Sequence, residues 1–513
     1  MARAQKNRAS KREYVSPTQL VLNGFETPFS QRLNPSNRWV VLAHKIPWDS
    51  LVGVYSSQML NDKTGASGIN PRVAIGSIII KHMCDLSDRE TVLQIQENMY
   101  MQYFIGYSSF SNAEPFDPSL FVEFRKRLGM DQINEINEKI LGLGKEEESE
   151  NEEEPIIENS EQEKEDTPDL NYSVPSHEGQ LILDATACPQ DISYPTDLNL
   201  LSDAREKSEQ LIDTLYDADK HGKKKPRTYR EKARKQYLQT AQKKTKTKKE
   251  IHRAIKKQLS YVRRNISSIH KLLDSSSSIP LNRFQYKYLL VIQTLYDQQV
   301  EMFLEKIHST PHRIVSIHQP HVRPIVRGKT NARVEFGAKI QVSLMNGFAF
   351  LDELGWEAFN EGQYLLSTVE LYKRRFGFYP QEVLADKIYC NRENRAKLKE
   401  LKIILRAKPL GRPKAVDVEH VRPGERNPIE GKFGQAKTAY GLNRIKARLQ
   451  QTSESWIASI IMVLNLVKLA GQVPLCFLLK GMSYSATRIK IFLDNILTYW
   501  SELKNSSEKL IVT

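Results

Sequence analysis

The chain has 513 residues, which is more than one ordinary domain. Its 40% hydrophobic and 27% charged residues can build a substantial core, so disorder throughout the chain is excluded. The net charge of +14 favours a polyanionic partner. A disulfide framework and a structural zinc site are disfavoured, because the four cysteines lie far apart without a CxxC pair, at Cys84, Cys188, Cys390 and Cys476.

The first part of the chain has a helical pattern. Pro71 can occupy the first turn of a helix, and Ser87 followed by Glu90 is typical of a capping box. Residues 118–128 predict another amphipathic helix with a basic end. We therefore expect residues 1–143 to form an all-helical domain. Such domains often bind DNA, but amphipathic helices also serve only as core elements, and the two interpretations are about equally supported.

Two highly charged segments follow. Residues 145–169 hold 13 acidic residues and two lysines, which predicts a self-repelling, disordered acidic linker. Residues 220–264 hold 19 lysines and arginines against two glutamates, a local charge of +17. This basic segment suits contact with DNA phosphates, although a solvated helical surface is the alternative. The segment contains three tyrosines, Tyr229, Tyr237 and Tyr261. Packing against neighbouring helices is the favoured role for them, and stacking on unpaired bases is the alternative.

After the linker, strands alternate with helices. Strands are predicted at residues 180–185, 313–317, 334–344, 347–351, 382–385 and 403–406, with Asn346-Gly347 as a hairpin turn. Helices are predicted at residues 248–307 with a break near 275–280, at 365–375, at 392–401 and from Pro428 onward. We expect a mixed α/β fold with these boundaries: helical N-terminal domain 1–143, acidic linker 144–178, first part of the core 179–202, inserted basic helical region 203–312, remainder of the core 313–472, and a helical tail 473–513.

The sequence shows no signal for export or for a membrane. Residues 1–14 are polar and basic, without an apolar core of the kind that export signals carry. The apolar stretch 456–470 is shorter than a bilayer span and is interrupted by Asn465 and Lys468, so it predicts a buried helix. We expect a soluble, cytoplasmic protein without a membrane partner.

Three carboxylates stand at positions that suit chemistry. Asp184 lies within an apolar strand, Asp386 follows another strand, and Glu430 lies in the first turn of a helix. Ionised carboxylates are rarely buried without a partner or a metal. Three converging carboxylates form a hard oxygen site suited to Mg²⁺ or Mn²⁺, and two such ions can activate a water or a 3′-OH at a phosphodiester.

Each carboxylate also has an ordinary explanation. Asp184 is compatible with a hydrogen-bonded residue at the end of a strand, and Asp386 with a helix cap. Glu430 would occupy the third helical position, as in a capping box, if Asn427 is the N-cap and Pro428 the first helical residue. The catalytic interpretation depends on the combination of the three rather than on any one of them.

The surroundings of Glu430 favour the catalytic interpretation. Arg426 precedes it by four residues and Lys437 follows it by seven, so the three share one helical face if the helix includes Arg426. Gly431 and Gly434 weaken a helix interior by up to about 1 kcal/mol each, which is easier to understand if a backbone or ligand approaches there. A carboxylate between two cations suits a metal ligand beside phosphate-binding groups.

These residues carry a family resemblance. RNPIEGKFGQAK, residues 426–437, resembles the R-x3-E-x6-K part of the signature of DDE transposases from bacterial insertion sequences, of the IS5/IS1182 type. LILDATACPQ would supply the first Asp and VLADKIYCNREN the second. RPIVRGKTNARVEFGAK and LSDRETVLQIQENMYMQYFIG match further stretches, so that the likeness runs from about residue 20 to 470. The full signature has a Tyr three residues before the Arg, where this chain has Pro423, and a role for that Tyr is not carried over.

The resemblance implies an RNase H-like catalytic core in which Asp184, Asp386 and Glu430 are catalytic and bind two Mg²⁺ or Mn²⁺ ions. It implies hydrolysis of the phosphodiester at the transposon end, followed by attack of the freed 3′-OH on target DNA. Double-stranded DNA would be the partner, bound by a homodimer. The residues expected to contact DNA are Arg426, Lys437, Arg444 and Arg448, and more weakly Arg323, Arg327 and Lys329, for which a solvated hairpin is equally supported.

Two other functions stay open. A metal-dependent nuclease would cut DNA without joining it, and a transposase-derived DNA-binding protein would do neither. The complete set of three carboxylates argues against the second, because a site that is no longer catalytic need not keep all of them.

Overall fold

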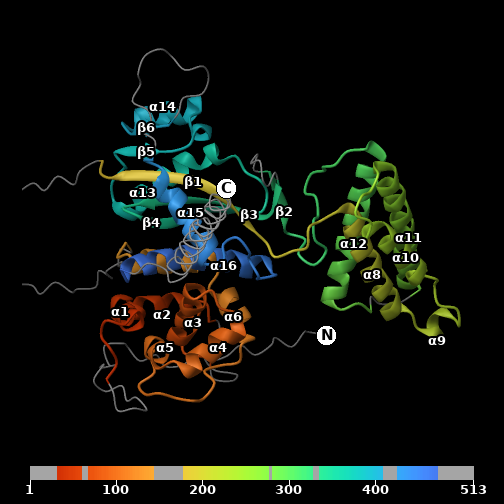
Figure 1. The fold of residues 1–513 in the computed structure, drawn as a ribbon, viewed down its shortest axis with the longest axis horizontal. Coiled ribbons are helices and arrows are strands. Elements are labelled where there is room, and N and C mark those ends of the chain that lie inside the picture. The colour runs from red at the N-terminus through yellow and green to blue at the C-terminus, as the bar shows by residue number, and fades with distance from the viewer. Residues whose placement is uncertain are drawn as a thin grey trace, which may run out of the picture. The chain divides into compact units, whose positions relative to one another are not determined.

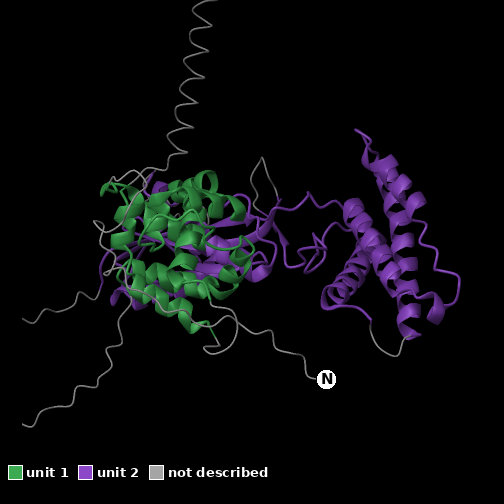
Figure 2. Ribbon diagram, turned by 90° about the horizontal axis from the view of Figure 1, so that it is seen from below, with its two compact units in different colours: residues 1–145, 430–441, 459–513 green, residues 146–429, 442–458 purple. Residues whose placement is uncertain are grey.

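The computed structural model describes residues 32–59, 68–143, 177–275, 280–326, 334–407 and 424–471 (Figure 1). The described chain divides into two compact units (Figure 2). The first comprises the described parts of 1–145, 430–441 and 459–513, and the second those of 146–429 and 442–458. Nearly all of the acidic linker and the whole of the C-terminal tail expected from the sequence lie outside the described residues. The expected domain boundaries stay a prediction.

The described residues before 144 form a helical bundle. Its helices are α1 (Arg38–Lys45), α2 (Trp48–Ser57), α3 (Pro71–Met83), α4 (Asp88–Glu97), α5 (Met99–Phe104), α6 (Leu120–Arg127) and α7 (Met130–Ile140). As predicted, Pro71 opens a helix, and the Ser87 side chain accepts the Glu90 backbone N–H. Every residue of α3 is buried, so this helix is the centre of the bundle and has no solvent face.

A mixed sheet forms the centre of the second unit. Its strands are β1 (Gln180–Pro189), β2 (Arg323–Val326), β3 (Val334–Met345), β4 (Phe348–Gly355), β5 (Glu382–Leu384) and β6 (Ile404–Arg406). The order is β2-β3-β1-β5-β6, and β4 also pairs with β3. Strand β3 is antiparallel to β1, β2 and β4, whereas β1, β5 and β6 run parallel. The predicted hairpin is present, with Asn346 and Gly347 at φ 48° and 77°.

Short helices pack on one face of this sheet. They are the 3₁₀ turns η3 (Glu361–Tyr364) and η4 (Lys387–Tyr389) and the helices α13 (Leu365–Phe376) and α14 (Arg392–Glu400). Leu181 and Leu183 of β1 pack with Tyr372, Val383 and Tyr389 in one buried cluster. These helices therefore cover the face that carries Leu181 and Leu183, and Asp184 points to the opposite face because side chains alternate along a strand.

The inserted region is a helical block with a core of its own. It contains α8 (Asp197–Leu215), α9 (Ala218–His221), α10 (Arg230–Ala241), α11 (Lys248–Asp274) and α12 (Arg283–Glu305). The expected break between the two long helices is present. The strand expected at residues 313–317 is wrong: Ile314 and Ile317 are buried in the core of the helical block without forming a strand.

Two helices complete the described chain, α15 (Asn427–Ala439) and α16 (Gln450–Leu469). Helix α16 is long and apolar enough to cross a membrane by length and composition, but 83% of its most apolar stretch is buried inside the protein. It is thus the buried helix that the sequence predicted over 456–470. The described residues contain no other helix of this kind.

Candidate functional site

Asp184 lies in the middle of β1, so it is not a residue of the strand end. Its side chain is 20% exposed, and its Oδ1 accepts the backbone N–H of Ala185 at 2.8 Å. Burial raises the pKa of Asp184 above its ordinary value, and the nearby positive charge of Arg426 works against that shift. A carboxylate kept at such a position costs stability unless a cation accompanies it.

Asp386 follows β5, two residues beyond Leu384. Leu384 pairs with Ile182 in the parallel ladder, and Asp184 lies two residues beyond Ile182. The strand register therefore places the two aspartates at the same level on neighbouring strands. Asp386 also caps η4, because its Oδ1 accepts the Lys387 N–H at 2.7 Å. The capping role considered from the sequence is thus confirmed, and it holds the carboxylate in place without covering it, since 58% of the side chain is exposed.

The side chain of Arg426 bridges the two aspartates. Its Nη2 lies 3.0 Å from Asp184 Oδ2, and its Nη1 lies 3.4 Å from Asp386 Oδ1. The guanidinium is largely buried, with 18% of the side chain exposed, and its Nε has no hydrogen-bond partner among the described residues. The second unit therefore brings together three of the residues selected from the sequence.

A fourth carboxylate, Glu361 of η3, was missed by the sequence analysis. It forms an ion pair with Lys339 of β3 at 2.8 Å, and both side chains are largely buried. Its negative charge acts on Asp184 and contributes to raising the pKa of that group. No sequence signal marks Glu361, because its place depends on how η3 packs beside β3.

Glu430 is exposed and lies in the first turn of α15. The chain runs from Arg426 directly into this helix, and Lys437 lies in its last turn. A Cβ added at Gly431 or Gly434 would meet no atom within 4 Å. No described protein group therefore explains these two glycines by close packing.

The remaining DNA-contact candidates have varied surroundings. Arg323 lies in β2 and is held by Glu357, with Nε and Oε1 2.7 Å apart. Arg444 is exposed and pairs with Asp191 at 3.0 Å, and Arg448 is exposed. Arg327 and Lys329 lie outside the described residues.

The described residues contain no group of three or more His, Cys, Asp or Glu side chains arranged to hold a metal ion. The Asp184–Asp386 pair nevertheless fits part of such a site. Its oxygens are hard ligands from two adjacent strands, and they already hold one cationic group, the Arg426 guanidinium, between them.

Comparisons with known proteins agree with this chemistry. Residues 383–467 match a family model described as a transposase DDE domain, and residues 27–127 match a transposase domain (DUF772). The first match contains Asp386, Arg426 and Glu430. Over 108 residues, 20% of this chain, the sequence is 33% identical to an uncharacterized protein, ORF8 in the nfe locus of Rhizobium meliloti.

The match spans about half, 49%, of that relative's length. No solved structure gives a significant match. The two matches lie in sequence along the chain, and Asp386, Arg426 and Glu430 all fall within the second. The chain thus contains two segments that are similar to transposase domains, and the second is similar to a transposase DDE domain.

Proposed function

We propose that this protein is a DNA transposase of the IS5/IS1182 type, which binds the terminal inverted repeats of its element, hydrolyses the phosphodiester at the element's end and joins the 3′-OH to target DNA. The observation that carries the proposal is the closeness of Asp184, on β1, and Asp386, just after the parallel strand β5, with Arg426 bridging the two. The closeness of these two carboxylates costs stability, because their negative charges repel each other.

An RNase H-like core is proposed for the second unit. The mixed sheet supports it, because β4, β3 and β1 are antiparallel neighbours and β5 and β6 continue parallel to β1. In this core the first aspartate lies on the central strand β1 and the second follows its neighbour β5. The basic helical block is then the insertion between β1 and the rest of the sheet.

Asp184, Asp386 and Glu430 would hold two Mg²⁺ or Mn²⁺ ions, which when bound supply an activated water or 3′-OH and neutralise the leaving oxygen. The residues of the chain position these groups. The Ala185 and Lys387 backbone N–H groups orient the two aspartates through 2.8 and 2.7 Å hydrogen bonds. Glu430 is exposed at the start of α15 and is the third ligand in this proposal.

Phosphates of the DNA backbone are proposed to contact the cations of α15 and of the segment after it. Lys437 lies on α15, and Arg444 and Arg448 are exposed beyond it. The open space beside Gly431 and Gly434 supports this path, because a side chain at either position would stand where a backbone could approach. Arg323 is a weaker candidate, since Glu357 already neutralises it.

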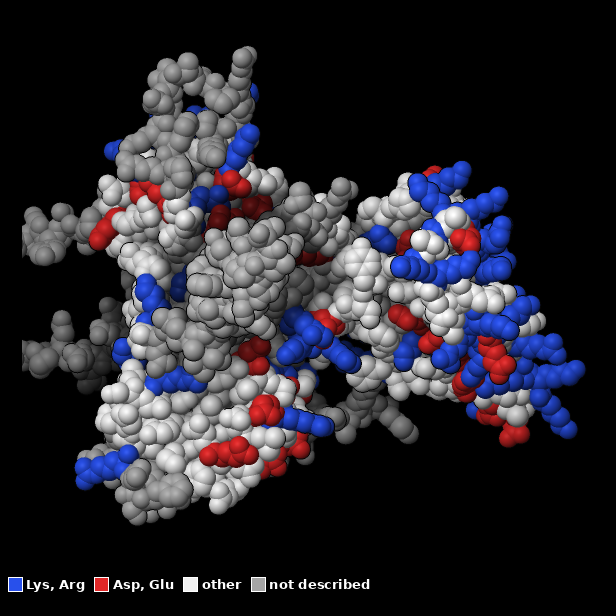
Figure 3. Space-filling view, in the orientation of Figure 1, with Lys and Arg blue, Asp and Glu red and all other residues white. Residues whose placement is uncertain are grey.

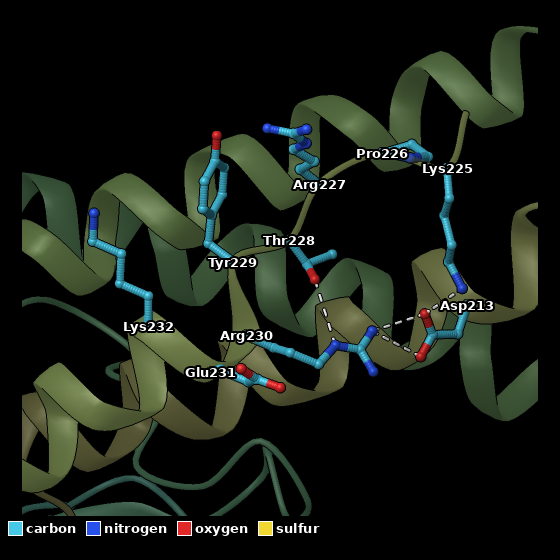
Figure 4. A pocket seen from close by; sticks show the side chains of 9 residues that line it. All are labelled: Asp213, Lys225, Pro226, Arg227, Thr228, Tyr229, Arg230, Glu231 and Lys232. Atoms are coloured by element: carbon cyan, nitrogen blue, oxygen red, sulfur yellow. Dashed lines mark hydrogen bonds and ion pairs between the residues drawn. The ribbon is translucent and has the colours of Figure 1, made fainter.

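The helical block is proposed to supply most of the sequence-independent affinity. Figure 3 shows lysine and arginine side chains gathered over this block. A cavity of about 620 Å³ on it is lined by Asp213 and by the run Lys225, Pro226, Arg227, Thr228, Tyr229, Arg230, Glu231 and Lys232. In Figure 4, Lys225 and Arg230 point to Asp213, while Arg227, Tyr229 and Lys232 point away from it. Arg227 and Lys232 are exposed, and we propose that they contact phosphates.

Two further properties belong to the same proposal. Joining two ends of one element requires two active sites, so we propose a homodimer on DNA. A cytoplasmic, nucleoid-associated protein follows from a chromosomal DNA substrate in a bacterial cell.

The test is an Asp386→Asn variant of the full chain, assayed on DNA that carries the ends of the element. Mg²⁺-dependent cleavage should be lost and DNA affinity kept, because the amide keeps the η4 cap but loses the anionic ligand. Glu393→Gln, an exposed carboxylate in the first turn of α14, is the matched control and should cleave as the wild type does. Undiminished cleavage by the Asp386 variant would refute the assignment.

Pre-cleaved ends separate transposition from the nuclease alternative. The wild type should join a pre-cleaved 3′-OH end to target DNA. Cleavage without any joined product would favour a nuclease, and absence of both would favour a DNA-binding protein without catalysis.

A further inference from the structure

One guanidinium group satisfies both aspartates of the site. Arg426 contacts Asp184 Oδ2 and Asp386 Oδ1 at 3.0 and 3.4 Å. The positive charge of Arg426 lowers the pKa of Asp184, whereas the negative charges of Glu361 and Asp386 raise it. Lys339 is nearby but is bound to Glu361. Arg426 is therefore the group that offsets the negative charge of this site.

Arg426 contacts the Asp184 oxygen that a metal ion would need, Oδ2. Asp184 Oδ1 and Asp386 Oδ1 already accept backbone N–H groups, so Asp184 Oδ2 is the Asp184 oxygen without a backbone donor. Mg²⁺ binds oxygen ligands at about 2.0–2.1 Å, and a guanidinium group on the same oxygen would repel it at that range. Arg426 and a metal ion would therefore compete for Asp184 Oδ2.

We propose that Arg426 is an internal counterion, which bridges Asp184 and Asp386 in the metal-free protein and is displaced from them when a divalent cation binds. This rests on the proposed function. The displaced guanidinium becomes available to a DNA phosphate, which it cannot contact bidentately while both Nη groups are held by aspartates. Metal binding and phosphate binding by Arg426 are then coupled, and each favours the other.

The surroundings of Arg426 fit an exchangeable contact. Its Nε makes no hydrogen bond with the described residues, so the side chain is held by its two ion pairs, and one of these ends on a carboxylate that is 58% exposed. Arg426 also directly precedes α15, whose first turn carries Glu430. The counterion and the third proposed ligand therefore lie on one short stretch of chain.

The experiment measures binding of Mn²⁺ to the full chain without DNA, by calorimetry and by the electron paramagnetic resonance signal of free Mn²⁺. Arg426→Gln should bind Mn²⁺ about tenfold more tightly than the wild type, because a positive charge that competes for the same oxygens has been removed. Arg313→Gln removes the same charge from a partly buried pair with Asp197 and should leave the Mn²⁺ affinity unchanged. Equal or weaker Mn²⁺ binding by Arg426→Gln would overturn the proposal.

A second measurement covers the case in which Arg426→Gln is poorly folded. Without metal this variant should melt at a lower temperature than the wild type, since two aspartates are left without their counterion, and Mn²⁺ should raise its Tm more than that of the wild type. Arg426→Lys keeps the charge but cannot bridge both aspartates in the same way, and its Mn²⁺ affinity should fall between the two. A Tm increase no larger than that of the wild type counts against the proposal.

The aspartates themselves distinguish this proposal from the proposed function. Asp386→Asn should abolish the tight Mn²⁺ binding of the Arg426→Gln background. If Mn²⁺ binding is independent of Asp386, the metal site is elsewhere and the proposed function fails with it. If binding depends on Asp386 but Arg426→Gln brings no gain, only the counterion role is refuted.

Discussion

At the scale of single residues, the site combines two roles in one side chain. Asp386 caps η4 and also contacts Arg426, so its capping role is confirmed, while its role as a metal ligand stays a prediction. Asp184 differs, because its hydrogen bond to the next backbone N–H stabilises no element end, and its burial raises its pKa. A buried carboxylate whose energetic cost is met by a single arginine is more readily explained by function than by stability.

His321 provides a residue-scale prediction away from the site. Its ring lies edge-on to Trp356, with centroids 4.4 Å apart, and burial together with Lys287 and Arg323 lowers its pKa from 6.5 to about 4. The unfolded chain therefore takes up a proton below about pH 6.5, while the folded protein does so only near pH 4. The free energy of unfolding should fall as the pH drops through this window.

His321→Gln removes this titration, so its stability should fall less than that of the wild type between pH 7 and pH 4.5 in urea unfolding. His308→Gln, at an exposed position, is the control and should follow the wild type. Parallel curves for the wild type and His321→Gln would contradict the assignment of the titrating group.

At the scale of elements, period and turn chemistry predicted most of the second unit. The Asn346-Gly347 hairpin, the β5 strand and the helices α13 and α14 were all expected from local patterns. The strand expected at residues 313–317 is absent, because Ile314 and Ile317 pack into the core of the helical block rather than into the sheet. Alternation predicts which side chains are buried, but not against which neighbour they are buried.

The residues of the site could be predicted from the sequence, but the contacts between them could not. Asp184 was indicated by its place inside an apolar strand and Asp386 by its place after another strand, but the bridge through Arg426 depends on the register of β1 with β5. The ion pair of Glu361 with Lys339 could not be predicted from the sequence for the same reason. Their pairing depends on contacts between elements that no local pattern encodes.

Two glycines give a matched prediction at this scale. Gly337 of β3 lies so close to β1 that a Cβ would overlap the carbonyl oxygen of Cys188, so Gly337→Ala must push the two strands apart. We expect a loss of about 1–3 kcal/mol in the free energy of unfolding. Gly434→Ala, on α15, meets open space and should instead gain up to about 1 kcal/mol.

Urea unfolding of the two variants measures this difference, and its sign is the result that matters. A stable Gly337→Ala would show that β1 and β3 do not pair in the observed register. If Gly434→Ala is more stable but cleaves DNA ends poorly, the glycine is there for a close approach of DNA.

At the scale of the whole molecule, the net charge of +14 is unevenly placed. The segment 220–264 carries +17 and the segment 145–169 carries −11, so most of the basic excess belongs to the helical block. This block has its own buried apolar core, centred on α8, α11 and α12, to which none of the described basic residues belongs. Its surface charge is therefore free to serve binding.

The last prediction concerns this charge. We expect that replacing Arg227, Lys232, Arg253 and Lys257, which line two cavities of the helical block, with glutamine weakens DNA binding of any sequence. Each lost phosphate contact lowers the slope of log affinity against log salt by roughly 0.9, so four contacts lower it by roughly 3–4. Mn²⁺ affinity should not change, because none of the four residues contacts Asp184 or Asp386.

The control removes the same charge from exposed positions on and after α14, with Arg392, Arg395, Lys399 and Lys402 replaced by glutamine. The slope of its log affinity against log salt should change by less than roughly 0.9, the value of one phosphate contact. Equal slopes in the two variants would mean that overall charge, and not the surface of the helical block, determines DNA affinity. An unchanged slope in the first would remove this block from the DNA-binding surface and leave affinity to the cations that follow β6 in the chain.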